Sequence, residues 1–541
     1  NAPKTLLSQL SSFDQMERGT LSILRQTTKG PCCNFQKWDG TSHRSEYIPA
    51  DQVPFVEANI ARYRDFQSVV DQYVDLVGEQ SRQERLAGGK KKRPTKHLLA
   101  QEAEIQELIV TFNNKSPKGS DVAELELLVR TAIFKPANDL VGMLLQKAAN
   151  RIDAAYIPKP GEESKGREPL LVQGMFGTTL LIRQYYYHSG KKCGHFPADA
   201  ALGLEGGYTP ALARLICLEG GDETSFIQAS SHLWEVGGIR VSERQIQRVV
   251  GRVGEDAQAW QKRESAPGPC DAKILYISAD ATGVPMRAEE LAGRKGKAPD
   301  GKAKTRMAML GCVFTQHTED DQGRPLRDHD STTYLSGFQS PSDFGIGLRR
   351  EAIRRGLFSV PETVLLIDGA TGLEKLGDDY FSDAVQIVDF FHAMEHLQTL
   401  IETLWGKGDE VRNNRRRHNW KKLLAHDGVE RIIKQARKEA SLRGNVAEAE
   451  AVLGYFVHNV SRMQYGSFRA KNYFIGSGVI EAGCRTVIGK RCKQSGMHWG
   501  EAGAEKVLAF RCIHASRNLD LFWKYRLNSR SAENDTLPLA A

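Results

Sequence analysis

Long hydrophobic stretches are missing from this sequence. No apolar run reaches the roughly 18 residues that a helix needs to cross a bilayer. The opening segment, NAPKTLLSQL, contains neither a methionine nor the apolar core of a signal peptide. We therefore expect no transmembrane helix and no secretory signal. The 541 residues are 40% hydrophobic and 26% charged, with a mean hydropathy of -0.43, which is typical of a soluble protein of about three to four domains.

Paired cysteines are also missing. The nine cysteines are an odd, scattered set without a Cys-x-x-Cys motif, which argues against a disulfide framework and against a complete zinc ribbon. This usage fits a reducing cytosol, and we expect a cytoplasmic location. The stretch YYYHSGKKCGH at 185–195 has the form of a degenerate ribbon. Zinc binding by His188, Cys193 and His195 stays open, although the missing partner of Cys193 favours an interpretation without metal.

Internal repeats and long low-complexity tracts are absent, but the basic residues are unevenly spread. The formal net charge is +8, which slightly favours the binding of polyanionic partners. Residues 405–440 contain eleven Lys or Arg against five Asp or Glu, and residues 482–500 contain four against none. Basic runs are most often solvated faces. Contact with a nucleic-acid backbone is the alternative, because neutralising phosphates releases counterions.

Two aspartates follow apolar runs. Asp280 lies in ILYISADATGVPM at 274–286, and Asp368 lies in TVLLIDGA at 363–370. A carboxylate at the end of a buried strand is costly unless something pairs with it. Each aspartate alone fits the cap of a turn. Two that meet at one sheet edge fit a shared divalent cation, because close carboxylates otherwise repel each other.

From Lys273 onward the pattern changes to strands and helices in a definite order. Three strands come first, and helices alternate with two more strands after them. The expected strands are 273–280, 306–316, 331–338, 363–368 and 384–390. This order resembles that of the ribonuclease-H-like fold, in which the first and fourth strands lie side by side. Asp280 and Asp368 would then be neighbours.

A third acidic residue follows much later. In GSGVIEAGCR at 476–485, a Gly-Ser-Gly segment precedes a helix that carries Glu481. Two divalent ions that catalyse phosphoryl transfer usually need a third carboxylate. Residues 393–475, between the fifth strand and this helix, are strongly helical and too long for a loop. We interpret them as a helical insertion.

Residues 208–256 have the pattern of a helix-turn-helix bundle. Thr209 and Pro210 predict the start of its first helix, and Ser242 with Gln245 predicts a capping box on its last helix. Three arginines lie near the start of this last helix, where recognition helices meet DNA. They are Arg240, Arg244 and Arg248. A plain three-helix bundle is the alternative.

The N-terminal part of the chain has a simpler pattern. NFQKWDGTSHRSEYIP at 34–49 predicts a hairpin that turns at Asp39-Gly40. Residues 51–85 predict one long amphipathic helix, and 87–97 predict a linker with glycines, a basic run and a proline. A packing or dimerisation arm is the structural interpretation of this hairpin and helix.

These patterns give a scheme of seven segments. They are an N-terminal hairpin–helix module at 1–95, a helical linker region at 96–168, a helix-turn-helix-like DNA-binding domain at 169–262, the first part of the α/β core at 263–392, the helical insertion at 393–475, the last part of the core at 476–525 and a tail at 526–541.

Four motifs together resemble a known family. SADATGVPM, LLIDGA, IVDFFHAMEHL and GSGVIEAGCR are similar to the acidic motifs of DDE transposases, in particular bacterial insertion-sequence enzymes of the ISKra type, which are related to the Mutator-like superfamily. Asp389-Phe-Phe-His392 matches the Asp-x-x-His signature that this family carries after its second acid. The resemblance covers about 170–520. Residues 1–95 resemble, more weakly, a small accessory domain of bacterial mobile-element proteins. The Cys-poor HSGKKCGH departs from relatives that have a full ribbon.

The resemblance implies a multidomain α/β protein with a ribonuclease-H-like core, and it implies roles for single residues. Asp280, Asp368 and Glu481 would be the catalytic triad and would bind two Mg²⁺ ions, which Mn²⁺ can replace. His392 would be a further catalytic residue, held by Asp389. The alternative is that Asp389 caps a helix and His392 packs beside it. The implied reaction is phosphodiester hydrolysis at element ends, followed by strand transfer to target DNA.

The resemblance also implies partners. These are double-stranded DNA, at the element ends and the target, and a second copy of the chain when DNA is bound; the location would be the bacterial cytoplasm, at the nucleoid. The expected DNA-contacting residues are Arg240, Arg244, Arg248, Arg415, Arg416, Arg417, Arg485, Lys490, Arg491 and Lys493. A related nuclease on the same fold and a catalytically inactive DNA-binding protein derived from a transposase are the alternatives.

Overall fold

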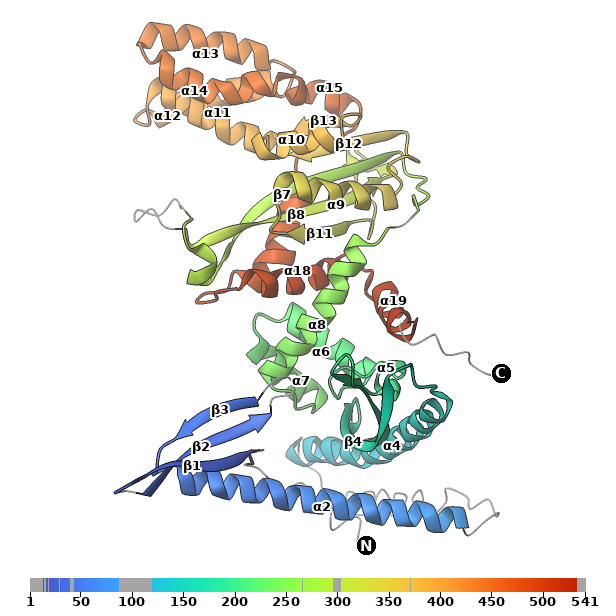
Figure 1. The fold of residues 1–541 in the computed structure, drawn as a ribbon. Coiled ribbons are helices and arrows are strands. Elements are labelled where there is room, and N and C mark those ends of the chain that lie inside the picture. The colour runs from blue at the N-terminus through green and yellow to red at the C-terminus, as the bar shows by residue number, and fades with distance from the viewer. Residues whose placement is uncertain are drawn as a thin grey trace. The chain divides into compact units, whose positions relative to one another are not determined.

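The computed structural model describes most of the chain. The described residues are 13, 16–17, 19–28, 30–38, 43–86, 119–264, 266–294, 303–369 and 371–532. Contacts divide the chain into two units, Asn1–Glu104 and Ile105–Ala541 (Figure 1). Helices and sheets both contribute, which agrees with the prediction of a multidomain α/β protein. Among the described residues, no helix is both long and apolar enough to span a bilayer.

The described residues of the first unit form a three-stranded antiparallel sheet and a long helix. Its elements are β1 (Thr20–Thr27), β2 (Gly30–Trp38), β3 (His43–Ile48) and α2 (Val53–Leu86). Phe35 from β2 shares a buried apolar cluster with Val56 and Ile60 from α2. The predicted strands and helix are confirmed. The predicted turn at Asp39-Gly40 and the predicted linker lie outside the described residues.

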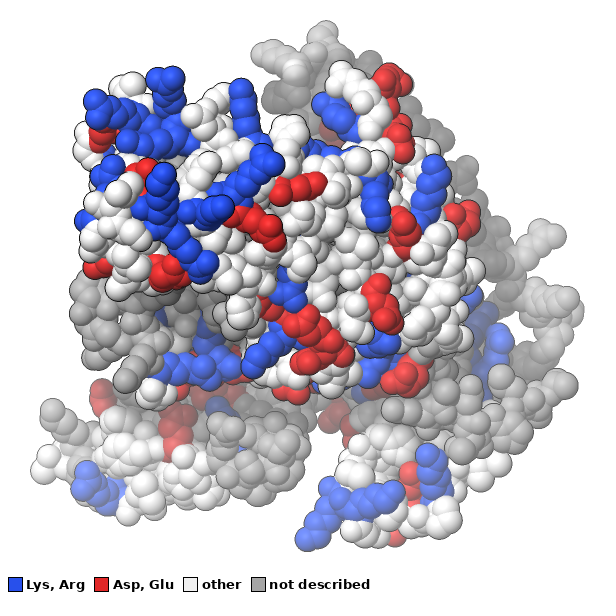
Figure 2. All heavy atoms as spheres, turned by 90° about the horizontal axis from the view of Figure 1, so that it is seen from above, with Lys and Arg blue, Asp and Glu red and all other residues white. Residues whose placement is uncertain are grey.

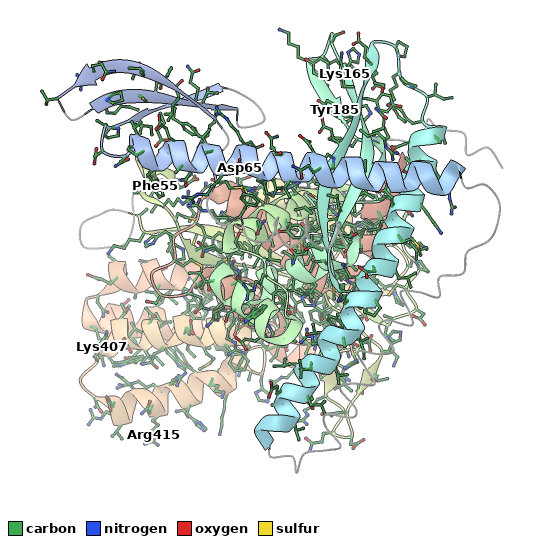
Figure 3. The ribbon with its side chains drawn as sticks, turned by 90° about the horizontal axis from the view of Figure 1, so that it is seen from below. Phe55, Asp65, Lys165, Tyr185, Lys407 and Arg415 are labelled. Carbon is green, nitrogen blue, oxygen red and sulfur yellow. The ribbon has the colours of Figure 1, made fainter. Side chains whose placement is uncertain are left out.

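The described residues of the second unit begin at Gly119, with a long helix followed by a β-hairpin. Its first elements are α4 (Gly119–Ala155), β4 (Glu162–Gly174), β5 (Gly177–His188), β6 (Cys193–His195) and the short α5 (Pro197–Ala201). The sequence predicted mostly helical structure here, and the long β4–β5 ladder corrects that prediction. Its physical reason is that Thr178, Thr179 and Ile182 are β-branched and favour a strand. Figure 3 marks this hairpin with Lys165 and Tyr185.

Three helices follow the hairpin and form a bundle. They are α6 (Pro210–Asp222), α7 (Phe226–Gly237) and α8 (Glu243–Lys262). Thr209 caps α6, which begins at Pro210, and Ser242 forms a capping box with Gln245 at the start of α8. The predicted helix starts are therefore confirmed. The bundle arrangement fits both a helix-turn-helix and a plain three-helix bundle.

A five-stranded sheet lies at the centre of the second unit. Its order is β11–β8–β7–β12–β13. The strands are β7 (Ile274–Pro285), β8 (Thr305–Gln316), β11 (Thr333–Gly337), β12 (Glu362–Ile367) and β13 (Val385–Val388). β8 is antiparallel to β7 and β11, whereas β12 is parallel to both β7 and β13. All five predicted strands are confirmed, and the first and fourth lie side by side.

Each face of this sheet packs against its own set of helices. Leu275 and Ile277 of β7 face α9 (Pro341–Arg354) and α10 (Thr371–Tyr380) in one apolar cluster. Tyr276 of β7 belongs to the other cluster, which includes residues of α8 and of the C-terminal helices. This alternation follows from strand geometry, because successive side chains point to opposite faces.

The predicted insertion is formed by helices, as expected. They are α11 (Phe390–Trp405), α12 (Glu410–Leu424), α13 (Val429–Arg443), α14 (Val446–His458), the 3-10 turn η2 (Val460–Met463) and α15 (Tyr465–Ala470). Leu397, Leu404 and Ile432 are among the residues that form its apolar interior. Helices α11 to α14 lie at the upper left of Figure 1, and α15 lies to their right.

The chain then returns to the sheet. The last elements are α16 (Gly478–Gly483), the π-helix η3 (Cys484–Gly489), α17 (Lys490–Cys492), α18 (Glu501–Ala515) and α19 (Leu519–Ala532). Helix α8 packs closely along α18, and a Cβ on Gly254 of α8 would lie 2.6 Å from the Lys506 backbone oxygen. The bundle and the sheet domain therefore share one apolar interior.

Candidate active site

Three aspartates lie level with one another at one end of neighbouring strands. β12 pairs in parallel register with β7 on one side and with β13 on the other. Continuing the two registers past the end of β12 brings Asp368 level with Asp280 and with Asp389. Neighbouring strands lie about 4.8 Å apart, so three carboxylate-bearing residues stand side by side across the sheet.

These aspartates belong to the face of the sheet that carries the C-terminal helices. Asp280 lies on the same side of β7 as Tyr276, because strand side chains alternate. Tyr276 shares its apolar cluster with Ile480 and Cys484, the residues that anchor α16 and η3. The helix that carries Glu481 therefore covers the same face on which Asp280 stands.

Asp280 lies beside a thiol and near a lysine. Its carboxylate accepts the backbone N–H of Ala281 at 2.6 Å. Burial, reinforced by the negative charge of Asp280 and a hydrogen bond to it, raises the pKa of Cys484, so this thiol stays protonated. Lys493 bonds through Nζ to the hydroxyl of Thr282, further along β7. The aspartate thus has a hydrogen-bond donor on one side and a cation close by.

Glu481 is held close to the sheet by a glycine. A Cβ at Gly483 would lie 2.7 Å from the ring of Tyr334 and 3.0 Å from Leu310, so a side chain there would push α16 away. The Glu481 side chain is itself 51% exposed, and the Ser477 hydroxyl donates to its Oε1 at 3.1 Å. Helix α16 leads directly into a π-helix, a rare element that often marks functional sites.

Asp389, His392 and Glu481 form a compact group of possible metal ligands. Their ligand atoms all lie within 4.8 Å of one another. His392 Nε2 lies 4.0 Å from Glu481 Oε1, and His392 Nδ1 lies 3.5 Å from Glu395 Oε2. Asp389 is fully buried, caps α11 by accepting the His392 N–H at 2.8 Å and also accepts the Ser477 N–H. Asp389 thus forms the cap of the alternative interpretation, and His392 additionally lies close to Glu481 of the predicted triad. The catalytic role of His392 stays a prediction.

Asp389 lies between the two aspartates and the glutamate of the predicted triad. Among the described residues, Asp280 and Asp368 belong to no compact group of three ligands. Asp389 belongs both to the row of aspartates in the sheet and to the group around Glu481. It is level with Asp368 and contacts the segment that begins the Glu481 helix. Carboxylate oxygens suit Mg²⁺ and Mn²⁺, while the imidazole of His392 is a ligand preferred by ions such as Zn²⁺ and Fe²⁺. The donor set therefore fits divalent ions.

Three arginines of the bundle lie on its surface. Arg240, Arg244 and Arg248 are all exposed, and the Arg240 guanidinium stacks on Trp234 at 4.3 Å from its ring centre. The buried side of α8 faces α6, α7 and α18, which leaves the arginines on the outward side. Their contact with DNA stays a prediction.

Arg491, which the sequence predicted to contact DNA, is buried instead. It is only 1% exposed, and it donates to the carbonyls of Gly220 at 3.2 Å and Thr224 at 3.4 Å. Its guanidinium lies between the rings of Phe226 and Trp499, 4.5 Å and 4.9 Å from their centres. Burial lowers its pKa to about 10. The residue is part of the interior because the π-helix ahead of it shifts which side of the helix faces inward.

The other basic residues differ in their exposure. Arg415 and Arg417 of α12 are exposed, whereas Arg416 is half-buried, donates to Asn413 at 2.9 Å and stacks on Trp405 at 4.4 Å. Figure 3 labels Lys407 and Arg415 on the insertion, and Figure 2 shows Lys and Arg gathered on the left side of the face viewed from above. Arg485, Lys490 and Lys493 are also exposed, close in sequence to Glu481.

The degenerate ribbon forms no compact metal-ligand group in the part of the chain that the structure describes. His195 lies 3.0 Å from the Tyr156 hydroxyl, and Cys193 is exposed. A second compact group does occur in the bundle, where His232 Nδ1 lies 2.5 Å from Glu219 and 3.6 Å from Glu223. The Glu219 hydrogen bond raises the pKa of His232, as expected for an ion pair.

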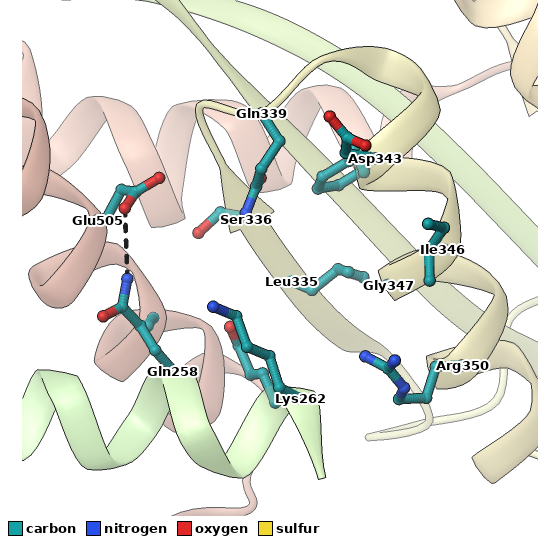
Figure 4. Close-up of a pocket in the computed structure, with 13 residues that line it drawn as sticks. Gln258, Lys262, Leu335, Ser336, Gln339, Asp343, Ile346, Gly347, Arg350 and Glu505 are labelled. Carbon is teal, nitrogen blue, oxygen red and sulfur yellow. Dashed lines mark hydrogen bonds between the residues drawn. The ribbon is translucent and has the colours of Figure 1, made fainter. Parts of the chain in front are cut away.

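A cavity of about 260 Å³ is lined by none of the four acids Asp280, Asp368, Asp389 and Glu481 (Figure 4). α8, β11, α9 and α18 surround it. Its polar lining includes Gln258, Lys262, Gln339, Asp343, Arg350 and Glu505. At one side of it, Gln258 donates to Glu505 at 3.4 Å. The cavity contains none of the predicted catalytic residues.

The sequence interpretation missed two residues that contact the acidic edge. Ser477 bonds both Asp389 and Glu481, and its position in the Gly-Ser-Gly segment was a usable signal. Tyr455 of α14 donates through its hydroxyl to the backbone oxygen of Asp368 at 2.9 Å. Nothing in the local sequence of α14 indicates this contact, because it depends on how the insertion folds back.

Comparisons with known proteins give a structural likeness but no match in sequence. No family matches the sequence, and no curated protein matches it. Among solved structures, the Drosophila P element transposase strand transfer complex matches with a TM-score of 0.29 and 10% sequence identity, over 57% of this chain and 92% of that chain. A likeness at this level does not assign a family or a function, so the function must be argued from the site.

Proposed function

We propose that the protein is a DNA transposase with a ribonuclease-H-like core, which cleaves phosphodiester bonds at element ends with divalent metal ions and joins the ends to target DNA. The observation that carries the proposal is the strand register. It sets Asp280, Asp368 and Asp389 level at one end of adjacent strands, on the face covered by the helix of Glu481. A sheet order of β11–β8–β7–β12–β13 with only β8 antiparallel to its neighbours supports the fold assignment.

Carboxylates on three strands and a facing helix can hold two ions. Asp280, Asp368 and Glu481 would be the ligands, with Asp389 and His392 beside Glu481. When bound, Mg²⁺ or Mn²⁺ would activate the attacking oxygen and stabilise the leaving oxygen of the phosphodiester. Ser477 orients Glu481 through its hydrogen bond, which lowers the cost of assembling the site.

Double-stranded DNA is the proposed partner. Exposed cations lie next to the acidic edge at Arg485 and Lys493 and on the insertion at Arg415 and Arg417. Such residues contact phosphates, which position DNA without reading its sequence. Arg240, Arg244 and Arg248 are the proposed contacts to element ends. Because two ends must be joined, the active form is proposed to contain at least two copies of the chain.

Substitution of the three acids tests the proposed catalysis. Asp280→Asn, Asp368→Asn and Glu481→Gln should each reduce Mg²⁺-dependent cleavage to background, because each removes a negatively charged metal ligand while keeping the shape of the side chain. The assay follows nicking of a plasmid that carries the DNA flanking the gene, with binding measured separately by gel shift.

The matched control is Asp321→Asn, which neutralises an exposed acid outside the proposed site. It should cleave at the wild-type rate. Full cleavage by any of the three acid variants would remove that residue from the site, and loss of DNA binding in all three would point to misfolding.

A catalytically inactive DNA-binding protein is the second candidate. The observation that favours it is that Asp280 and Asp368 do not share a compact ligand group with Glu481 among the described residues. DNA binding without any Mg²⁺- or Mn²⁺-dependent cleavage would support it. Cleavage without joined product would instead support a nuclease on the same fold.

A further inference from the structure

The insertion contacts the acidic edge through tyrosine hydroxyls. Tyr455 of α14 donates to the backbone oxygen of Asp368 at 2.9 Å, and Tyr465 of α15 donates to the backbone oxygen of Val388 at 3.0 Å. These two acceptors lie at the ends of β12 and β13. Two of the three strands that lead to a level aspartate, β12 and β13, therefore end in a hydrogen bond from the same helical insertion.

Tyr455 also packs tightly against the turn that follows Asp368. Gly369 has a left-handed backbone with a φ of 79°, and a Cβ there would lie 3.0 Å from both the ring and the hydroxyl of Tyr455. The imidazole of His396 stacks on the ring at 3.6 Å between centres, with 14° between the planes. The tyrosine ring is thus held on one side by α11 and reaches the turn with its hydroxyl.

The Tyr455 hydroxyl is the donor in its contact with Asp368. A protonated phenol that faces a backbone carbonyl can only donate to it. A second link supports the same junction, since Arg462 pairs with Glu374 at 3.1 Å and Asp378 at 2.7 Å on α10.

We propose that Tyr455 is a positioning residue, through which the insertion fixes the Asp368-Gly369 turn and thereby the orientation of the Asp368 carboxylate. The proposal rests on the proposed function, because it assigns Tyr455 a part in the geometry of that site. It explains why the insertion docks on the sheet end that carries the aspartates. The contact is made to a backbone oxygen, so it sets the peptide plane from which the carboxylate side chain departs.

The test compares two tyrosines that bond to opposite ends of the same strand. Tyr455→Phe removes only the hydroxyl at the Asp368 end, and Tyr473→Phe removes a hydroxyl that donates to Glu362 at 2.8 Å, at the start of β12. Each change deletes one hydrogen bond and keeps the ring. Both proteins are the full chain, assayed for single-turnover cleavage over a range of Mg²⁺ concentrations and for DNA affinity by gel shift.

Tyr455→Phe should lower the maximal cleavage rate about tenfold, in line with the loss of one well-formed hydrogen bond. It should also raise the Mg²⁺ concentration that gives half the maximal rate, while DNA affinity stays within about twofold. Tyr473→Phe should leave the rate and the Mg²⁺ dependence unchanged. A merely structural role would lower the melting temperature of both variants without changing the Mg²⁺ dependence.

Asp368→Asn, measured in the same series, separates the two claims. If it abolishes cleavage while Tyr455→Phe behaves like Tyr473→Phe, the positioning role is overturned and the proposed function stands. If cleavage survives Asp368→Asn, Asp368 is removed from the proposed site and the positioning role falls with it. Absence of Mg²⁺-dependent cleavage by the wild-type protein would instead overturn the proposed function itself. A selective effect of Tyr455→Phe on rate and Mg²⁺ dependence supports both.

Discussion

Arg491 shows how a charged side chain in a basic run becomes part of an interior. Its donors reach two backbone carbonyls and its guanidinium lies between two aromatic rings. Arg491→Ala should lower the free energy of unfolding by about 3 kcal/mol, because it leaves a cavity and unpaired carbonyls. Chemical denaturation followed by tryptophan fluorescence measures this change.

The matched variant is Arg485→Ala, which removes the same side chain from an exposed position of the same segment. Its free energy of unfolding should stay within about 0.5 kcal/mol of wild type, while its DNA affinity falls. Equal stabilities for the two variants would contradict the structural role of Arg491.

For single residues, the sequence predicted where the two aspartates lie better than it predicted which side chains are buried or hydrogen-bonded. The placement of Asp280 and Asp368 on neighbouring strands was predictable, because an aspartate after an apolar run is unusual and needs a partner. The burial of Arg491 was not predictable, because a π-turn adds a residue and changes the helical phase that a 3.6-residue period assumes. Ser477 and Tyr455 act through hydrogen bonds that only the folded chain brings together.

Among the elements, the short helix α16 depends on the absence of a side chain at one position. Gly483→Ala should lower the free energy of unfolding by about 2 kcal/mol, because the added methyl group meets Tyr334 and Leu310. It should also slow cleavage, since the helix that carries Glu481 must move away from the sheet. Thermal unfolding and the plasmid nicking assay measure the two effects.

Gly503→Ala on α18 is the control for that change. A Cβ at Gly503 meets nothing within 4 Å, so alanine should add about 0.5 kcal/mol by reducing the freedom of the unfolded chain. If Gly483→Ala were as well tolerated as Gly503→Ala, the close approach of α16 to the sheet would be disproved.

The elements of the sheet were predictable, and the hairpin before the bundle was not predicted. β7 and β12 are short apolar runs bounded by turn residues, and the later strands alternate with helices in a recognisable order. The β4–β5 hairpin was missed although Thr178, Thr179 and Ile182 favour a strand, because the glycines at 174 and 177 also fit a loop between helices. Long-range pairing, such as that of β7 with β12, followed only from the resemblance of the strand order to a known fold.

On the scale of the whole molecule, the insertion carries the basic run at 405–440. Arg415 and Arg417 of this run are exposed. Replacing both Arg415 and Arg417 with Gln should weaken DNA binding equally for all sequences. The slope of log affinity against log salt should fall by about 0.9 for each phosphate that the variant no longer neutralises. Fluorescence anisotropy with a labelled duplex at several salt concentrations measures both quantities.

Arg437 and Arg443 provide a control with the same change in charge. Both belong to the insertion, but each pairs with an acidic neighbour, at 2.7 Å and 3.5 Å. Replacing this pair with Gln should leave the salt slope unchanged. A similar drop in affinity for both double variants would mean that net charge alone governs binding.

The packing of α8 along α18 has a consequence for where DNA would be cut. Because the bundle and the sheet domain share one interior, the arginines at the start of α8 stand at a set distance from the acidic edge. Under the proposed function, the base sequence bound by these arginines and the phosphodiester bond that is cleaved would be separated by a constant length of duplex. Moving the gripped sequence along the DNA would move the break with it, base pair for base pair.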